Sequence, residues 1–380
     1  MTANKLIPVC EPLYLGNEIA YVEDAVKSGW ISSAGEYLNK FEKAFAEYCG
    51  AKHAIATTSG TTALHLALVA HGVGEGDEVI IPNFTMAAVL LSVLYCGATP
   101  VFVDATRDTW CIDVEQLKKK ITKKTKAIIP VHIYGHPADM NEINLLAKDA
   151  GISVIEDAAE SHGATYFGKR CGSLSDSACF SFYANKIITT GEGGMVVTSN
   201  DEIAEKCRYF KNLCFSLKGP RDYWHNDIGF NYRMTNVQAA LGLAQVEHID
   251  EFVRRRRANA AQYLEALSGI EGLTLPVEKP NMTNVYWMFG FVVDKNVFGC
   301  SRDELAVKLI EKGIQTRTFF RPLHRQKMLE ARGISDLGSY PQSELLGEGG
   351  MYLPSGSGLT QTEIAFVANC VREIHQALRK

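Results

Sequence analysis

The sequence predicts an α/β protein in which a large domain with a mostly parallel sheet precedes a smaller C-terminal α+β domain. Through the first two thirds of the chain, short β-branched apolar runs alternate with segments of helical periodicity, which is typical of a parallel sheet covered by helices on both faces. After about residue 250, charged helical segments dominate. The length of 380 residues allows two domains, and we expect them at 1–250 and 251–380.

The predicted elements follow in order along the chain. The first strand ends in "AIATTS" at 54–59, and we expect the next helix at 61–72, closed by Gly72. Further strands are predicted at 78–82, 99–104, 125–135, 152–157, 177–182 and 193–199, with a helix at 139–150. In the last third we expect a helix at 249–268 that carries the domain boundary, a strand at 284–294, a helix at 301–313 capped by Ser301 and a helix at 361–378.

Composition excludes several classes of function. The formal net charge of −4 and the pI near 6.2 disfavour nucleic acid, and the basic run "RRRR" at 254–257 is predicted to form a solvated or interface face of a helix. The ten cysteines form no C-x-x-C pair, and the start "MTANKLIPVC" has no secretory leader, so we expect a cytoplasmic protein. The longest apolar run, at 86–96, is too short to cross a bilayer.

Two polar groups lie where strands are predicted to end. The stretch "TTSGTTALHLAL" places a small glycine-containing turn before a helix, either as an ordinary Ser or Thr cap or as a phosphate site built from free backbone N–H groups. The stretch "VIEDAAESHG" ends a strand at Asp157, where a carboxylate faces the ligand crevice of a parallel sheet. That carboxylate suits a metal, a general base or a protonated ring nitrogen, or it caps the next segment.

The stretch "CFSFYANKIITTGEGG" carries Ser181 and then Lys186 between an apolar strand and a glycine-rich turn. Lys186 is either a solvated loop lysine or an amine that forms a Schiff base with a carbonyl. Pyridoxal 5′-phosphate (PLP) is the ligand that uses all four features together. Its phosphate suits the helix start and Ser181, its ring nitrogen suits Asp157, and its aldehyde suits Lys186.

Other catalytic patterns fit less well, and we expect no metal. His132 and His136 are four residues apart, but Gly135 and Pro137 interrupt any helix that would place them on one face. The sequence contains no H-E-x-x-H, no G-x-S-x-G and no Walker motif.

These residues lie in motifs that resemble the PLP-dependent sugar aminotransferases of the DegT/DnrJ/EryC1/StrS family. The motifs "SGTTALHLAL", "PVHIYGHPADM", "VIEDAAESHGA", "SFYANKIITTGEGGMV" and "GFNYRMTNVQAALGLAQ" follow the family in order, and the resemblance covers nearly the whole chain. It implies the type I aminotransferase fold, with a large domain around a seven-stranded sheet. It also implies a homodimer whose active sites lie at the subunit interface.

The resemblance implies a role for each matching residue. Lys186 is the lysine that forms the Schiff base, and Asp157 is the partner of the pyridinium nitrogen. Phe84 is the aromatic residue that covers the cofactor ring, or else a residue of the hydrophobic core. Glu160 lies near the ring hydroxyl, where many members have Gln, so its contact and charge state stay open. The implied phosphate-binding residues are Gly60, Thr61, Ser181 and, from the partner subunit, Asn231. Arg233 and His324 are candidates for substrate contact or for surface roles.

The resemblance also implies a reaction. A few relatives have His at the lysine position and act as dehydratases, so Lys186 favours transamination. The wording "FYANKIITTGEGGM" looks most like a branch that moves the amino group of L-glutamate to C4 of GDP-4-keto-6-deoxy-D-mannose, giving GDP-perosamine. The alternative is amination at C3 or C4 of a UDP- or dTDP-linked keto sugar. A non-catalytic PLP-binding sensor is disfavoured by Lys186 and Asp157 together. The nucleotide, the sugar stereochemistry and the glycan pathway are not fixed by these motifs.

Overall fold

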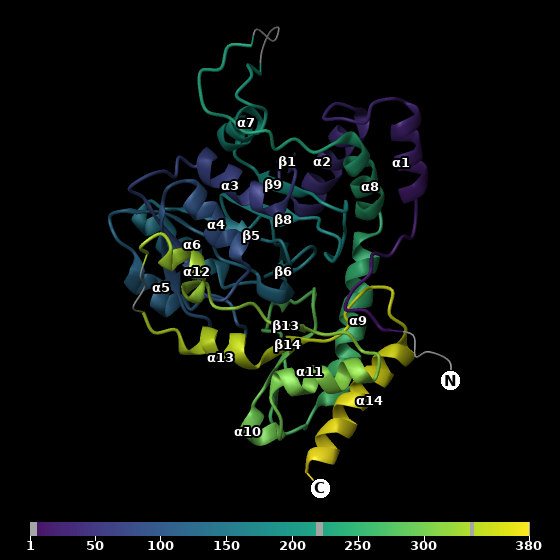
Figure 1. Cartoon of the computed structure of the whole chain (residues 1–380). Coiled ribbons are helices and arrows are strands. Elements are labelled where there is room, and N and C mark those ends of the chain that lie inside the picture. Colours follow the sequence, from purple (N-terminus) through teal and green to yellow (C-terminus); the bar gives the residue numbers. More distant parts are fainter. Residues whose placement is uncertain (1–5, 218–222, 335–337, 380) are drawn as a thin grey trace.

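The computed structural model describes residues 6–217, 223–334 and 338–379 of the chain (Figure 1). Its largest sheet has seven strands in the order β1-β9-β8-β5-β4-β2-β3. The neighbours from β8 to β3 pair in parallel, whereas β9 runs antiparallel to both β8 and β1. The strands are β1 His53–Thr57, β2 Glu78–Pro82, β3 Thr99–Val103, β4 Thr125–Ile128, β5 Ser153–Asp157, β8 Ser177–Ser181 and β9 Gly194–Thr198. The mostly parallel, seven-stranded sheet that we predicted is therefore confirmed.

Both faces of this sheet are covered. Successive residues of a strand point to opposite faces, and all five residues of β8 and of β9 are buried. Helix α3 packs on β8, β9 and the neighbouring helices α4 and α7, while α2 and α8 pack on each other and on α1 or β1. The helices that belong to this part of the chain are α1 Glu18–Lys27, α2 Glu36–Cys49, α3 Gly60–Ala70, α4 Ala87–Tyr95, α5 Val114–Lys120, α6 Met140–Ala150, α7 Asp201–Phe210 and α8 Asn236–Val246.

The last third of the chain builds a second layer of structure around its own core. A four-stranded antiparallel sheet, in the order β10-β12-β14-β13, packs with α9, α11 and α14 in the lower part of Figure 1. Its elements are α9 Ile249–Leu267, β10 Leu273–Thr274, β12 Gly290–Val293, α10 Lys295–Phe298, α11 Arg302–Glu311, β13 Arg317–Thr318, α12 Lys327–Glu330, α13 Pro341–Gly349, β14 Gly350–Tyr352 and α14 Gln361–Leu378. Ser301 caps α11, as predicted.

The two parts share chain segments. The N-terminal segment pairs with the lower part through a bridge between Ile7 and Ile314. In the other direction, β11 (Met282–Thr283) joins β6 (Thr165–Tyr166) and β7 (Lys169–Arg170) in a three-stranded sheet. Helix α9 extends from the upper part to the lower part (Figure 1). The division into domains at residues 250 and 251 stays a prediction.

Two predicted strands are shorter than expected, and strained backbone explains both. The strand predicted at 125–135 ends at Ile128, because Pro130 has no N–H and the chain turns at Tyr134 (φ 51°) and Gly135 (φ 103°) within the 3₁₀ turn Ile133–Gly135. The strand predicted at 284–294 is regular only at Gly290–Val293, since Tyr286 has a φ of 48°. Both irregular stretches lie beside the candidate site. Among the described residues, no helix is both long and apolar enough to span a membrane.

Candidate active site

Helix α3 begins at the carboxyl edge of the sheet and offers two free backbone N–H groups. Ser59 is the N-cap, and its hydroxyl accepts a hydrogen bond from the Thr62 N–H at 3.2 Å, while the Thr62 hydroxyl accepts from the Ser59 N–H at 3.0 Å. The Ala63 N–H donates to the Ser59 carbonyl. Gly60 and Thr61 keep N–H groups without an acceptor among the described residues, and the helix dipole adds positive potential there. The turn therefore offers two N–H donors that suit an anion.

Glycines let this turn approach the neighbouring strands closely. A Cβ at Gly60 would lie 2.8 Å from Cβ of Ser181, at the end of β8. A Cβ at Gly194, which pairs with Ser181 across β8 and β9, would lie 2.2 Å from the carbonyl oxygen of Ser59. The Ser181 side chain, itself 8% exposed, is thus beside the start of α3. The structure brings Gly60, Thr61 and Ser181 together, as a shared phosphate site requires.

Asp157 ends β5 at the same edge and is 5% exposed. Its Oδ1 accepts a hydrogen bond from the Ala159 N–H at 3.0 Å, and no described residue donates to Oδ2. Burial raises the pKa of Asp157, while the N–H of Ala159 and the charge of Lys186 oppose that rise. A buried carboxylate with one unused oxygen suits a cationic N–H donor on a ligand.

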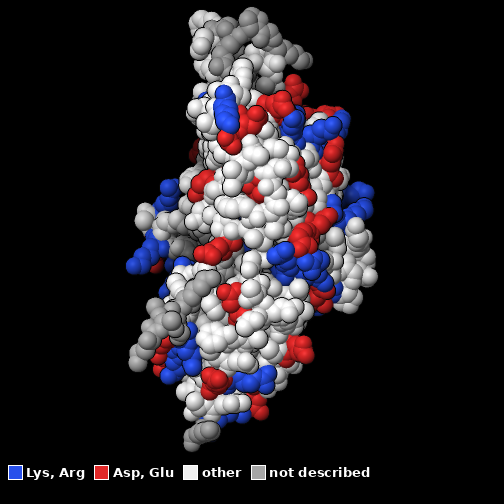
Figure 2. Space-filling view, turned by 90° about the vertical axis from the view of Figure 1, so that its right-hand side faces the viewer, with Lys and Arg blue, Asp and Glu red and all other residues white. Residues whose placement is uncertain are grey.

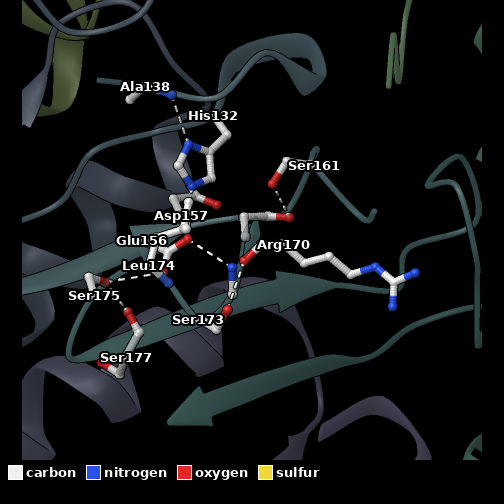
Figure 3. A network of polar contacts seen from close by, with 12 residues as sticks. His132, Ala138, Glu156, Asp157, Ser161, Arg170, Ser173, Leu174, Ser175 and Ser177 are labelled. Carbon is white, nitrogen blue, oxygen red and sulfur yellow. Dashed lines mark hydrogen bonds and ion pairs between the residues drawn. The ribbon is translucent and has the colours of Figure 1, made fainter. Parts of the chain in front are cut away.

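Glu156, the residue before Asp157, points to the opposite side of β5, and its hydrogen bonds hold this end of the strand in place. Glu156 is fully buried, and its carboxylate accepts hydrogen bonds from the N–H groups of Gly172 and Leu174, both at 2.8 Å (Figure 3). His132 accepts a hydrogen bond from the Ala138 N–H at Nδ1, so its Nε2 carries the hydrogen that it donates to Glu156 at 3.0 Å. Cys171 lies close to this pair, but these contacts identify the group as a structural network that supports β5.

Lys186 follows β8 and is held over an aromatic ring. Its Nζ lies 3.7 Å from the centroid of the Trp287 ring and 3.9 Å from Oε1 of Glu160. The Trp287 indole N–H donates to the carbonyl of Asn185 at 2.8 Å, which ties the lysine loop to the lower part of the molecule. Burial lowers the pKa of Lys186, Glu160 and Asp157 oppose this, and Arg256 adds to the lowering. A buried amine with a lowered pKa is suited to nucleophilic attack on a carbonyl.

Glu160 connects Lys186 to the strained turn at Tyr134. Its Oε2 accepts a hydrogen bond from the Tyr134 N–H at 2.7 Å, which accounts for the positive φ at that tyrosine. Burial raises the pKa of Glu160 to about 7, although the charge of Lys186 opposes the rise. Glu160 is therefore positioned to hold or release a proton near neutral pH.

An aromatic cluster closes the site on the side of the last third of the chain. Phe84, which follows β2, is fully buried and packs against Tyr134, Phe319 and Phe320 at ring-centroid distances of 6.1, 5.7 and 6.3 Å. Tyr134 also stacks on Trp287. Phe84 thus lies at the same sheet edge as the polar groups, although its contact with a ligand ring stays a prediction.

The described residues fit PLP. The free N–H groups at the start of α3 suit a phosphate, the unused oxygen of Asp157 suits a protonated ring nitrogen, and Lys186 suits an aldehyde. In addition, the side-chain oxygen of Asn185, next to the lysine, is buried without a hydrogen-bond partner, as expected beside a polar ligand. The strands β1, β5 and β8 run in the same direction, so these groups share one edge of the sheet.

Comparison with known proteins decides the family. The model of the DegT/DnrJ/EryC1/StrS aminotransferase family matches residues 14–372. The chain belongs to this aminotransferase family. It is 45% identical to GDP-perosamine synthase from Caulobacter vibrioides over 362 residues, 94% of this chain and 95% of that protein. It is 42% identical to GDP-perosamine synthase from Escherichia coli O157:H7 over 371 residues, 98% of this chain and 99% of that protein.

A solved structure confirms the fold and the cofactor. A putative sugar aminotransferase from Streptococcus pneumoniae, in its PLP form, matches with a TM-score of 0.90 at 26% identity, over 98% of this chain and 99% of that chain. The aminotransferase described here therefore has the predicted α/β fold of PLP-dependent aminotransferases and uses PLP. The two curated relatives are named for a sugar linked to GDP, a nucleotide.

The remaining predicted residues lie on the rim of the aminotransferase site or beside it. Asn231 is exposed, and Arg233, whose backbone pairs with Thr57 at the end of β1, donates from Nη1 to Asn212 at 3.0 Å. His324 is 6% exposed in its side chain and has both ring nitrogens engaged, with Asn83 at 2.8 Å and with Glu344 at 3.2 Å. The roles proposed for Asn231, Arg233 and His324 stay predictions.

Two features of the aminotransferase were not predicted from the sequence. Trp287, from the last third of the chain, lies under the Lys186 amine. The run of four arginines was predicted as a solvated or interface face, and this is wrong at Arg256, which is 2% exposed and points to the lysine loop. The helical spacing of polar residues did not indicate which of the four would face inward.

Proposed function

We propose that the enzyme transfers the amino group of L-glutamate to C4 of GDP-4-keto-6-deoxy-D-mannose and so makes GDP-perosamine. The observation that carries the proposal is the meeting of Lys186, Asp157 and the α3 anion site at one sheet edge, in a chain whose curated relatives at 42% and 45% identity are named GDP-perosamine synthase. The place of action that we propose is the cytoplasm, which the ten free cysteines support.

The chain's own residues divide the work. When bound, PLP supplies an aldehyde that holds amino groups and a ring that accepts the electrons of a carbanion. Lys186 would hold that aldehyde, and its amine, when free, would move a proton at the substrate carbon. Burial keeps a share of its amine neutral, as proton transfer requires.

Asp157 and Glu160 differ in role because their surroundings differ. Asp157, whose Oδ2 accepts no hydrogen bond from a described residue, would hold the protonated ring nitrogen and so favour electron withdrawal. Glu160 faces the Lys186 amine at 3.9 Å and has its pKa raised to about 7 by burial, so it can exchange a proton near neutral pH. Trp287 and the aromatic cluster around Phe84 limit access of water to the reacting atoms.

A second copy of the chain completes the site in this proposal. Asn231 is exposed, which suits a residue that reaches the phosphate of a partner subunit. Figure 2 shows the side of the molecule that carries α1, and uncharged residues cover much of its upper half. Ile19 and Val26 of α1, together with Trp30 and Ile31, are exposed apolar residues that support an interface there.

The first test compares three 4-keto-6-deoxy sugars, linked to GDP, UDP and dTDP, with L-glutamate as amino donor. We expect amino-sugar and 2-oxoglutarate formation with the GDP sugar and at least about tenfold lower kcat/KM with the other two. Lys186→Ala is the negative control, and we expect its turnover to be about 10³-fold or more below that of the wild type while its fold stays intact. Preference for a UDP or dTDP sugar would overturn the substrate, whereas substantial turnover by Lys186→Ala would overturn the site.

A further inference from the structure

Arg256 is a buried cation that no carboxylate neutralises among the described residues. It belongs to a run of four arginines on α9, and the other three each pair with a glutamate: Arg254 and Arg255 with Glu251, and Arg257 with Glu278. Arg256 is 2% exposed and has only neutral hydrogen-bond acceptors. Burying a guanidinium without a counter-charge is costly, so its position calls for a reason.

The partners of Arg256 come from four separate segments that meet at the candidate site. Its Nη1 donates to the carbonyl of Trp287, and its Nη2 contacts the carbonyl of Lys186 at 3.4 Å. Nη2 also lies 3.2 Å from the sulfur of Cys10, and Nε donates to the hydroxyl of Ser357 at 3.1 Å. One side chain thus joins α9, the lysine loop, the indole floor, the N-terminal segment and the segment before α14.

The guanidinium of Arg256 contacts the backbone of Lys186, with Nη2 3.4 Å from its carbonyl oxygen, and its charge opposes protonation of the Lys186 amine. The titratable groups that interact with Lys186 are Glu160, Asp157, Cys10, Arg256 and the neutral, buried His162. The two carboxylates attract a proton to the amine, whereas Arg256 is the nearby fixed cation that opposes it. Because the site is buried, solvent screens this repulsion little.

We propose that Arg256 is a positioning residue that holds the Lys186 loop against Trp287 and keeps a permanent positive charge beside the reactive amine. This inference rests on the assignment of Lys186 as the residue that links to PLP. The planar guanidinium of Arg256 reaches two carbonyls on different segments, so it can hold the Lys186 loop in place. Its fixed positive charge opposes protonation of the Lys186 amine.

The test uses the PLP-loaded enzyme and follows the visible absorbance of the Lys186 linkage as a function of pH. Arg256→Met removes the charge and keeps an apolar stem, and we expect the midpoint of the absorbance transition to rise by about one pH unit. Arg256→Lys keeps a charge but loses the fork, and we expect a midpoint near that of the wild type with a weaker visible circular dichroism signal. Arg254→Met, on the exposed face of the same helix, is the matched control and should leave both readouts unchanged.

The outcomes separate the inference from the assignment on which it rests. If borohydride does not attach the cofactor to Lys186 in the wild type, the site assignment fails. If attachment occurs but Arg256→Met titrates like Arg254→Met, the inference about Arg256 is overturned. Should Arg256→Met not fold, an Arg256→Lys enzyme with unchanged circular dichroism would equally overturn the holding role.

Discussion

Glu160 and Lys186 show how burial sets the chemistry of individual residues in this site. Desolvation raises the pKa of the acid and lowers that of the amine, and their 3.9 Å separation limits both shifts. His162, nearby in sequence, is instead packed among the rings of Phe45, Phe180 and Phe182, and burial lowers its pKa to about 3. It stays neutral and acts as part of the core.

Glu160 makes a pH-dependent contribution to the stability of the cofactor-free protein. Its pKa is about 7 in the folded chain and about 4.5 when unfolded, so between these values the folded state binds the extra proton. The free energy of unfolding must therefore fall as the pH rises through this window. We expect the unfolding free energy of Glu160→Gln to lack this decrease. Measured by urea unfolding, the wild type should lose on the order of 2 kcal/mol more than the variant between pH 4.5 and pH 7.

The control for this measurement is Glu265→Gln, an exposed position on α9. Its unfolding free energy should follow the wild-type pH profile. A Glu160→Gln profile parallel to that of the wild type would contradict the shifted pKa.

At the scale of elements, sequence patterns predicted what local rules control. The turn before α3, the end of β5 and the cap of α11 depend on residues close in the chain, and each was predicted correctly. The two strands that proved short lie next to turns in which Tyr134 and Tyr286 adopt positive φ, and the Tyr134 N–H there donates to Glu160, a residue distant in sequence. Trp287 could not be predicted as part of the site, because only folding brings it to the lysine loop.

The close contact of α3 with β8 predicts the effect of a single methyl group. Gly60→Ala would place a Cβ 2.8 Å from Cβ of Ser181, so the start of α3 or the end of β8 must move. The two free N–H groups at the start of α3 would then change direction. We expect the affinity for PLP, measured by absorbance after dialysis, to fall at least about tenfold, or 1.4 kcal/mol.

Gly74→Ala is the matched control, because a Cβ there meets nothing within 4 Å and its φ is not positive. It should bind PLP like the wild type. Equal PLP affinity in the Gly60 and Gly74 variants would argue against the anion site at α3.

At the scale of the whole molecule, the site depends on more than one folded unit. Lys186, Asp157 and the α3 turn come from the large sheet, whereas Trp287 and the Phe319–Phe320 pair come from the lower part. Asn231 lies exposed on a segment that pairs with the chain near residue 212. A second subunit is therefore proposed as the third contributor.

Mixing two inactive variants tests this contribution. Lys186→Ala supplies an intact Asn231, and Asn231→Ala supplies an intact Lys186, so a mixed dimer holds one complete site if Asn231 acts on the partner. We expect activity to return to about a quarter of the wild-type value after random subunit exchange. Mixed samples that stay as inactive as the two parents would show that Asn231 serves its own chain or neither.

The indole of Trp287 bonded to Asn185, beside the reactive lysine, has a consequence for modularity. Exchange of the residues after about 250 with those of another protein would remove Trp287 from beneath the lysine loop, together with Arg256 and its contact to the loop. A chimera made at that junction would also replace side chains such as Val285 and Phe319, which the last third contributes to the core of the large sheet.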